Sequence, residues 1–134
     1  MENEKITAVV KAPYEKPKTM EIDKGLEALQ NIVGGDICAA DLPDMDDVFG
    51  FCNDEGLLIG LKPNFYRPEY GDGIVGAAVF VGAGADGRSI SLTPEQAKKV
   101  TTYLEENSVE SSYEFLYHIE TGFQNYKPKR QSVM

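Results

Sequence analysis

Apolar and polar residues alternate near the start of the chain and predict two extended segments. Residues 6–10 form the first segment, and residues 19–22 form the second. The connection between them is polar and contains Pro13 and Pro17, which cannot donate a backbone hydrogen bond inside a sheet. We therefore expect two strands joined by a turn.

The next residues have the spacing of an amphipathic helix. Leu26, Leu29 and Val33 recur three and four positions apart, which places them on one helical face. Asp23 can cap the first turn with its carboxylate, and Gly34 can end the helix because glycine adopts the left-handed conformation without steric cost. The pattern predicts a short helix between these two residues.

Three short apolar runs follow in the middle of the chain. Residues 37–42 form one, which Pro43 ends, and residues 48–52 and 57–61 form the other two. The polar residues 53–56 have the composition of a reversing turn. We expect three strands, of which the last two form a hairpin.

Residues 74–81 are the strongest apolar run of the chain, and residues 88–92 alternate as a half-buried strand does. Between them, residues 82–87 match the G-x-G-x-x-G pattern of dinucleotide-binding loops. Such a loop holds a pyrophosphate at the start of a helix. Because a strand pattern follows here, we interpret residues 85–87 as a hairpin turn.

Two capping patterns predict helices near the end of the chain. Residues 93–96, Thr-Pro-Glu-Gln, begin one helix, which Asn107 ends, and residues 111–114, Ser-Ser-Tyr-Glu, begin another, which ends near Gly122. The expected apolar stripes are Ala97, Val100 and Leu104 in the first helix, and Tyr113, Leu116, Tyr117 and Phe123 in the second.

These elements together indicate an α+β protein. A chain of 134 residues, 42% hydrophobic and 26% charged, suits one globular domain with a modest core. We expect a mixed or antiparallel sheet with one central helix and two C-terminal helices. The domain is predicted to span residues 1–123, and residues 124–134, with Lys127, Lys129 and Arg130, to form a short, flexible basic tail.

Short motifs at three places carry a resemblance to a known family. They comprise Leu26, Leu29, Gln30, Val33, Gly34 and Gly35, then Asn53, Glu55, Gly56, Leu57, Leu61, Pro63 and Asn64, and finally residues 74–76, 79–82 and 91–93. Their order and spacing over about residues 5–100 resemble the family catalogued as domain of unknown function 3846. The resemblance implies a small protein carried by a phage, a plasmid or a conjugative element of Gram-positive or gut bacteria. It implies no catalytic residues, because none are established for the family.

Charge is unevenly distributed along the chain. The net charge is −9, and residues 36–55 hold seven acids and no lysine or arginine. These acids are Asp36, Asp41, Asp44, Asp46, Asp47, Asp54 and Glu55. One interpretation is a solvated loop that keeps the protein soluble. The other is an electronegative surface, formed by all of them except Asp36, that meets a basic partner. Direct nucleic-acid binding by this body is disfavoured, because it would repel phosphates.

Residues 65–70, Phe-Tyr-Arg-Pro-Glu-Tyr, are the other candidate for partner contact. Tyrosine and arginine are enriched at interfaces, which makes Tyr66, Arg67 and Tyr70 candidate contact residues. The alternative is that these rings cover one end of the sheet.

The chain shows no recognisable catalytic set. We interpret Cys38 and Cys52 as buried free thiols in a reducing compartment. An enzymatic alternative would pair Cys52 with His118, although nothing nearby activates the thiol. The spacing of the aspartates matches no calcium loop, and one histidine with two separated cysteines does not complete a zinc site. We therefore predict no catalytic residue, no metal ion and no cofactor.

The sequence favours a non-enzymatic accessory protein of a mobile genetic element or phage that binds a host protein. A narrower hypothesis is an anti-defence inhibitor, anti-restriction or anti-CRISPR, whose carboxylates imitate phosphates toward a nucleic-acid-binding defence protein. The alternative is a module that binds a small molecule or nucleotide signal through Lys62, Arg67 and Arg88.

The expected location is cytoplasmic, without membrane contact, because the chain has no long apolar run and its start has no signal-peptide pattern. The sequence leaves the oligomeric state open, since an exposed sheet edge or the helix at Tyr113 could form a dimer.

Overall fold

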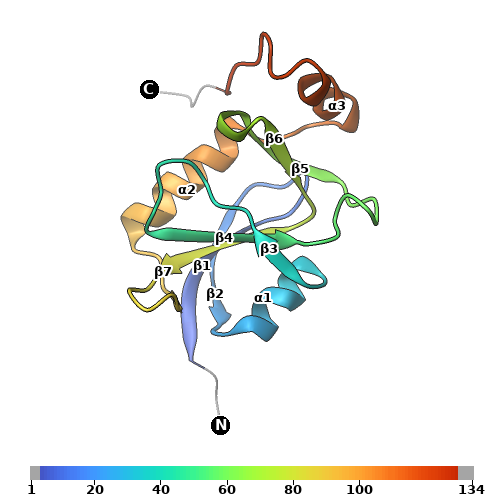
Figure 1. The fold of residues 1–134 in the computed structure, drawn as a ribbon. Helices are drawn as coiled ribbons and strands as arrows, with labels where there is room; N and C mark the ends of the chain where they lie inside the picture. The colour runs from blue at the N-terminus through green and yellow to red at the C-terminus, as the bar shows by residue number, and fades with distance from the viewer. Residues whose placement is uncertain (1–3, 130–134) are drawn as a thin grey trace.

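The computed structural model describes residues 4–129 and shows one α+β domain (Figure 1). Its elements, in chain order, are β1 (Lys5–Lys11), β2 (Lys18–Asp23), α1 (Leu26–Val33), β3 (Ile37–Ala39), β4 (Val48–Asn53), β5 (Pro63–Arg67), the 3-10 helix η1 (Pro68–Tyr70), β6 (Asp72–Val75), β7 (Ala78–Ala83), β8 (Ser89–Ile90), α2 (Pro94–Glu106) and α3 (Ser112–Glu120).

The main sheet is antiparallel and has the strand order β2-β1-β7-β4-β3, with β8 paired to the end of β7. At its centre, Phe80 of β7 lies opposite Val9 of β1 on one side and Gly50 of β4 on the other. β5 and β6 form a separate antiparallel pair. The predicted fold class is confirmed, and the sheet is antiparallel rather than mixed.

The main sheet has a hydrophobic core on each face. On one face, Val79 and Val81 pack with Leu29 of α1. On the other face, Phe80 packs with Val100 of α2 and with residues of β5 and β6. Every residue of β7 from 78 to 81 is completely buried, which explains why this strand is a continuous apolar run and does not alternate.

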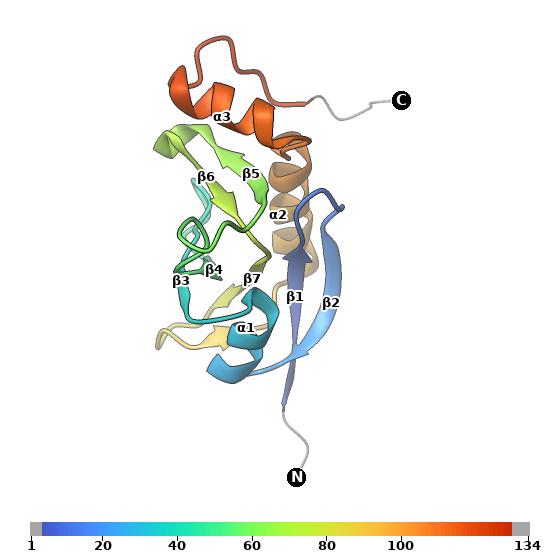
Figure 2. The same ribbon diagram turned by 90° about the vertical axis from the view of Figure 1, so that its right-hand side faces the viewer.

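Figure 2 shows α3 at the end of the molecule formed by β5 and β6, away from α1. This end is held together by aromatic rings: Tyr66 of β5 lies 5.8 Å from Phe115 of α3 and 5.1 Å from Tyr126 beyond it, between ring centroids. Lys129 N also donates to Glu106 O at 2.6 Å. The first part of the predicted basic tail, residues 124–129, therefore contacts the domain, and residues 130–134 lie outside the described part of the chain.

Several predicted helix ends are confirmed. Gly34 ends α1 in the left-handed conformation, with φ 80°. Thr93 and Gln96 form the expected capping box of α2, because Gln96 N donates to Thr93 Oγ1 at 3.1 Å and Thr93 N donates to Gln96 Oε1 at 2.8 Å. Ser111 caps α3 by accepting a bond from Glu114 N at 3.1 Å.

Other element boundaries differ from the predictions. Asp23 does not cap α1; it remains in β2 and forms an ion pair with Lys5, so Gly25 precedes the helix without a side-chain cap. The strand predicted at 37–42 ends at Ala39. The run at 74–81 is divided between β6 and β7 by a bend at Gly76, where φ is 77°.

The strand predicted at residues 57–61 is wrong. Residues 54–60 form successive turns, in which Ile59 N donates to Glu55 O at 3.0 Å and Leu61 N donates to Gly56 O at 2.9 Å. Leu57, Leu58 and Ile59 are exposed by 76%, 87% and 56%. Local turn bonds replace sheet pairing here, and they leave three consecutive apolar side chains in solvent.

The apolar stripe predicted for α3 is wrong for three of its four residues; only Phe123, which lies beyond the end of the helix, contacts Tyr66. Tyr113, Leu116 and Tyr117 are exposed, whereas Phe115 and His118 face the ring of Tyr66. A helix of nine residues presents two apolar faces here, and the sequence alone does not say which of them meets β5.

Candidate functional site

The loop between β3 and β4 carries four of the predicted contact residues. Asp41, Asp44, Asp46 and Asp47 are all exposed on it. We call residues 41–47 the acidic loop. The structure thus places four carboxylates on one short segment at one end of β4.

Hydrogen bonds from the rest of the domain anchor both ends of the acidic loop. Gly50 N donates to Asp41 Oδ1 at 3.0 Å, and Gln96 Nε2 donates to Asp47 Oδ2 at 2.7 Å. A Cβ atom at position 50 would lie 2.3 Å from Ala40 O, so the close approach of the loop to β4 requires glycine there. The loop is therefore anchored at both ends, through the carboxylates of Asp41 and Asp47.

None of these four carboxylates forms an ion pair with a basic side chain of residues 4–129. Arg67 reaches the acidic loop, but it donates to the backbone oxygen of Asp41 at 2.8 Å. Its other nitrogens bind both carboxylate oxygens of Asp72, at 2.9 and 2.7 Å. This bidentate bond raises the pKa of Arg67 above its ordinary value. Arg67 therefore fixes the loop without neutralising its carboxylates.

Tyr70 of η1 completes this surface. Its ring is half exposed, and Arg67 Cζ lies 4.8 Å from the ring centroid. A hollow of about 220 Å³ separates Tyr70 from the acidic loop, and it is lined on the loop side by Asp41, Asp44 and Asp46. The structure thus brings together Tyr70, Arg67 and the acidic loop, which the sequence analysis treated as separate candidates.

Tyr66 does not belong to this surface. Its side chain is 1% exposed, and its hydroxyl donates to Glu114 Oε1 at 3.2 Å. Burial, and then the nearby Glu114 carboxylate, raise the pKa of Tyr66 above its ordinary value. The alternative interpretation is correct for this residue: its ring covers one end of the β5–β6 pair, under α3.

Asp54 and Glu55 are separate from the acidic loop. They begin the turns at residues 54–60, at the opposite end of β4 (Figure 1). Their neighbours are the exposed side chains of Leu57 and Leu58. The seven acids of residues 36–55 therefore do not form one continuous surface.

The structure does not bring Cys52 and His118 together as a nucleophile and its base. Cys52 lies opposite Cys38, with their Sγ atoms 3.5 Å apart and no disulfide between them. Burial raises the pKa of Cys52 to about 12, which keeps it a thiol at neutral pH. His118 packs among Tyr66, Phe123 and Tyr126, and its buried Nδ1 has no hydrogen-bond partner. No group of three or more metal-ligating side chains was found among residues 4–129.

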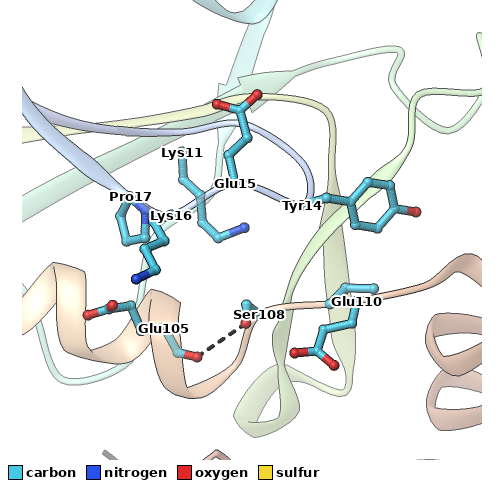
Figure 3. A pocket seen from close by; sticks show the side chains of 9 residues that line it. Lys11, Tyr14, Glu15, Lys16, Pro17, Glu105, Ser108 and Glu110 are labelled. Carbon is cyan, nitrogen blue, oxygen red and sulfur yellow. Dashed lines mark hydrogen bonds between the residues drawn. The ribbon is translucent and has the colours of Figure 1, made fainter.

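A pocket of about 340 Å³ lies between the β1–β2 turn and the segment that leaves α2 (Figure 3). The sequence analysis did not identify it. Charged residues from both of these segments line the pocket. The most deeply buried of them is Lys11, which is only 1% exposed. The lining residues are Lys11, Tyr14, Glu15, Lys16, Pro17, Glu105, Ser108, Val109 and Glu110.

Lys11 is held by backbone and amide oxygens. Its Nζ donates to Asn64 Oδ1 at 2.6 Å, to Asn64 O at 3.2 Å and to Ala12 O at 3.4 Å. Burial, and then the charge of Lys129, lower its pKa from 10.5 to about 8. One sequence signal was available: Lys11 follows Val9 by two positions on a strand, and both side chains therefore point to the same, buried face.

Within residues 4–129, no helix has the length and apolar character that crossing a membrane requires.

Comparison with known proteins identifies a family but no characterised relative. Comparison with curated proteins and with solved structures gives no significant match. The family model described as Domain of unknown function (DUF3846) matches residues 6–105, from β1 almost to the end of α2. The chain belongs to this family.

Proposed function

We propose that this protein is a non-enzymatic accessory protein of a mobile genetic element, and that it binds a basic host protein through the acidic loop. One observation supports the proposal most. Four exposed aspartates occupy an anchored seven-residue loop, and no basic side chain of the described residues pairs with them.

Solubility alone does not require this arrangement. Charges spread over the whole surface would give the same net charge without placing like charges side by side. Three of the four aspartates line one small hollow, and carboxylates repel each other where they lie within a Debye length, about 8–10 Å. A basic partner would relieve that repulsion, and the gain would increase both the affinity and the rate of association.

The hollow beside Tyr70 indicates what kind of side chain the partner would insert. It is lined by three aspartates and by Tyr70, whose ring already has Arg67 over one face. A guanidinium group can form charge-assisted bonds with carboxylates and stack on tyrosine at the same time. An arginine of the partner fits this chemistry better than a neutral side chain does.

Arginine-rich surfaces of host proteins commonly bind phosphates of nucleic acids. The narrower proposal is therefore an anti-defence protein, anti-restriction or anti-CRISPR, in which the acidic loop occupies the nucleic-acid site of a defence protein. The mobile-element setting implied by the family resemblance supports this version, since such elements meet host defences.

The test is capture of host proteins from lysate, with release of the captured proteins by duplex DNA. Wild type is compared with a variant in which Asp41, Asp44, Asp46 and Asp47 are changed to asparagine. Asparagine keeps an oxygen for the bonds from Gly50 and Gln96, and it tolerates the positive φ of 59° at position 44. The control variant changes exposed glutamates elsewhere to glutamine, again removing four negative charges: Glu21, Glu27, Glu95 and Glu120.

We expect wild type and the control variant to retain the same basic protein, and duplex DNA to release it. The asparagine variant should not retain it. If all three proteins capture the same set, or if the control loses the partner as well, the acidic loop is not the binding surface. Release by salt but not by DNA would remove the narrower, anti-defence proposal.

A further inference from the structure

The pocket around Lys11 has a feature that the acidic loop does not explain. The Lys11 ammonium is buried, yet its three hydrogen-bond acceptors are neutral carbonyl oxygens. None of the ion pairs among residues 4–129 involves it. A buried charge without an opposite charge is unfavourable, because water no longer solvates it.

One of the three acceptors is weak. Asn64 Oδ1 is close, at 2.6 Å, whereas Ala12 O lies 3.4 Å away, beyond the usual range of an N–H···O bond. One N–H of the ammonium can therefore turn toward a better acceptor on the pocket side. Asn64 is itself completely buried, and its Nδ2 donates to Lys11 O and Gly76 O at 2.8 Å each. These bonds keep Asn64, and with it the ammonium, in place.

We propose that this pocket binds a small molecule through a single anionic oxygen group, a carboxylate or a phosphate, which supplies the negative charge that Lys11 lacks. The volume of about 340 Å³ is at the lower end of the range for small-molecule sites. The pocket opens between the β1–β2 turn and the α2–α3 connection, so a ligand can enter without unfolding the domain (Figure 3).

Charges around the rim restrict the ligand to one anionic group. Two rim carboxylates already have cationic partners: Glu110 lies 3.1 Å from Lys129 Nζ, and Glu15 lies 3.7 Å from Lys18 Nζ. Glu105 forms no ion pair among the described residues. A polyanion would meet these carboxylates and be repelled. The charged and titratable groups that face Lys11 or line the pocket are Tyr14, Glu15, Lys16, Glu105, Glu110 and Lys129.

The experiment follows the Lys11 side chain by NMR in lysine-labelled protein, with acetate, inorganic phosphate or pyrophosphate added at constant ionic strength. Lys11→Met identifies the Lys11 signal. We expect acetate or phosphate to shift this signal in a saturable way and to raise the pKa of Lys11 above about 8. Because only the protonated amine attracts an anion, affinity should fall about tenfold for each pH unit above 8. A response to acetate alone would indicate a carboxylate ligand, and a response to phosphate alone would indicate a phosphate ligand. Pyrophosphate should bind no more tightly than either.

Glu105→Gln keeps the proposal testable if Lys11→Met fails to fold. Removing this carboxylate should strengthen anion binding, on the order of fivefold. Glu27→Gln, which removes an exposed carboxylate of α1 outside the pocket lining, is the matched control and should change affinity far less. The proposal is overturned if acetate and phosphate shift the Lys11 signal no more than chloride does. It is also overturned if Glu105→Gln leaves the affinity unchanged.

Discussion

The acidic loop and the Lys11 pocket both hold charges that form no ion pair within residues 4–129, but one set of charges is exposed to water and the other is buried. The four aspartates of the loop are exposed, and water stabilises them at little cost to folding. Lys11 is buried, and the burial of its charge lowers both the pKa of Lys11 and the stability of the domain. An exposed charge can be removed without unfolding the protein, so its removal should weaken partner binding. Removal of the buried charge should change the free energy of unfolding and the dependence of that free energy on pH.

The largest expected effect is that of Asn64→Ala. This change removes the closest acceptor of Lys11 and the two bonds from Asn64 Nδ2. It leaves a buried ammonium less well bound, so we expect a loss of about 3 kcal/mol in the free energy of unfolding. Urea denaturation measures it. Asn31→Ala, at an exposed position of α1, is the control and should change stability by about 0.5 kcal/mol or less.

A smaller effect is expected from pH. The pKa of Lys11 has its ordinary value of 10.5 in the unfolded chain and is about 8 in the folded one. Between pH 8 and pH 10.5 the unfolded chain therefore binds more protons than the folded chain does. Stability must therefore rise with pH, by about 1 kcal/mol between pH 7.5 and 9. Lys11→Met should remove this rise. A rise of the same size in the variant would show that another group causes it.

Cys52 and three tyrosines set the upper limit of that pH range. Burial raises the pKa of Cys52 from 9.0 to about 12, so the folded chain keeps this proton while the unfolded chain loses it, and stability begins to fall near pH 9. Burial raises the pKa of Tyr66, Tyr103 and Tyr126 above the ordinary value of 10.0. These hydroxyls keep their protons in the fold after the unfolded chain has lost them, so they lower stability as the pH rises past 10. The measurement should therefore end at pH 9.

The asparagine variant of the acidic loop should change stability by less than about 1 kcal/mol, and in the stabilising direction, because repulsion between carboxylates is removed. The same variant should lose its partner. Thermal unfolding at low and at high salt measures the first effect: added salt should reduce the difference between variant and wild type. A large loss of stability would mean that the carboxylates support the fold.

The smallest effect is expected at the exposed apolar turns. Leu57→Ser and Leu58→Ser should each change the free energy of unfolding by about 0.5 kcal/mol or less, since these side chains are 76% and 87% exposed. Leu104→Ala, at a completely buried position of α2, should cost about 2–5 kcal/mol and serves as the contrast. If the serine variants are equally destabilised, the turns at 54–60 pack in solution more tightly than the structure shows.

Features that depend on neighbouring residues were predictable from the sequence. The capping box at Thr93 and the glycine at position 34 act within three or four residues of the helix end, and both predictions are confirmed. The apolar run at residues 74–81 does lie in strands, but the bend at Gly76 that divides it between β6 and β7 was not predicted. Local chemistry therefore predicted the fold class and several of the helix ends, but it placed a strand at 57–61 where the chain forms turns.

Features that depend on distant partners were not predictable. Lys11 donates a hydrogen bond to Asn64, 53 positions away, and Tyr66 donates one to Glu114, 48 positions away. An apolar run such as 57–61 fits a strand by composition, but local turn bonds replace sheet pairing there and leave Leu57, Leu58 and Ile59 exposed. The acidic loop was found because its charge is contiguous in sequence, whereas the pocket is assembled from two separate segments.

The central claim is that the carboxylates of the acidic loop, and not negative charge in general, bind the partner. The most direct test measures the affinity of the purified, DNA-releasable partner for wild type, for the asparagine variant and for the glutamine control, at two salt concentrations. We predict equal, salt-sensitive affinities for wild type and control, and a weakening on the order of tenfold or more for the asparagine variant. Equal affinity of all three proteins, or equal weakening of both variants, would contradict the account.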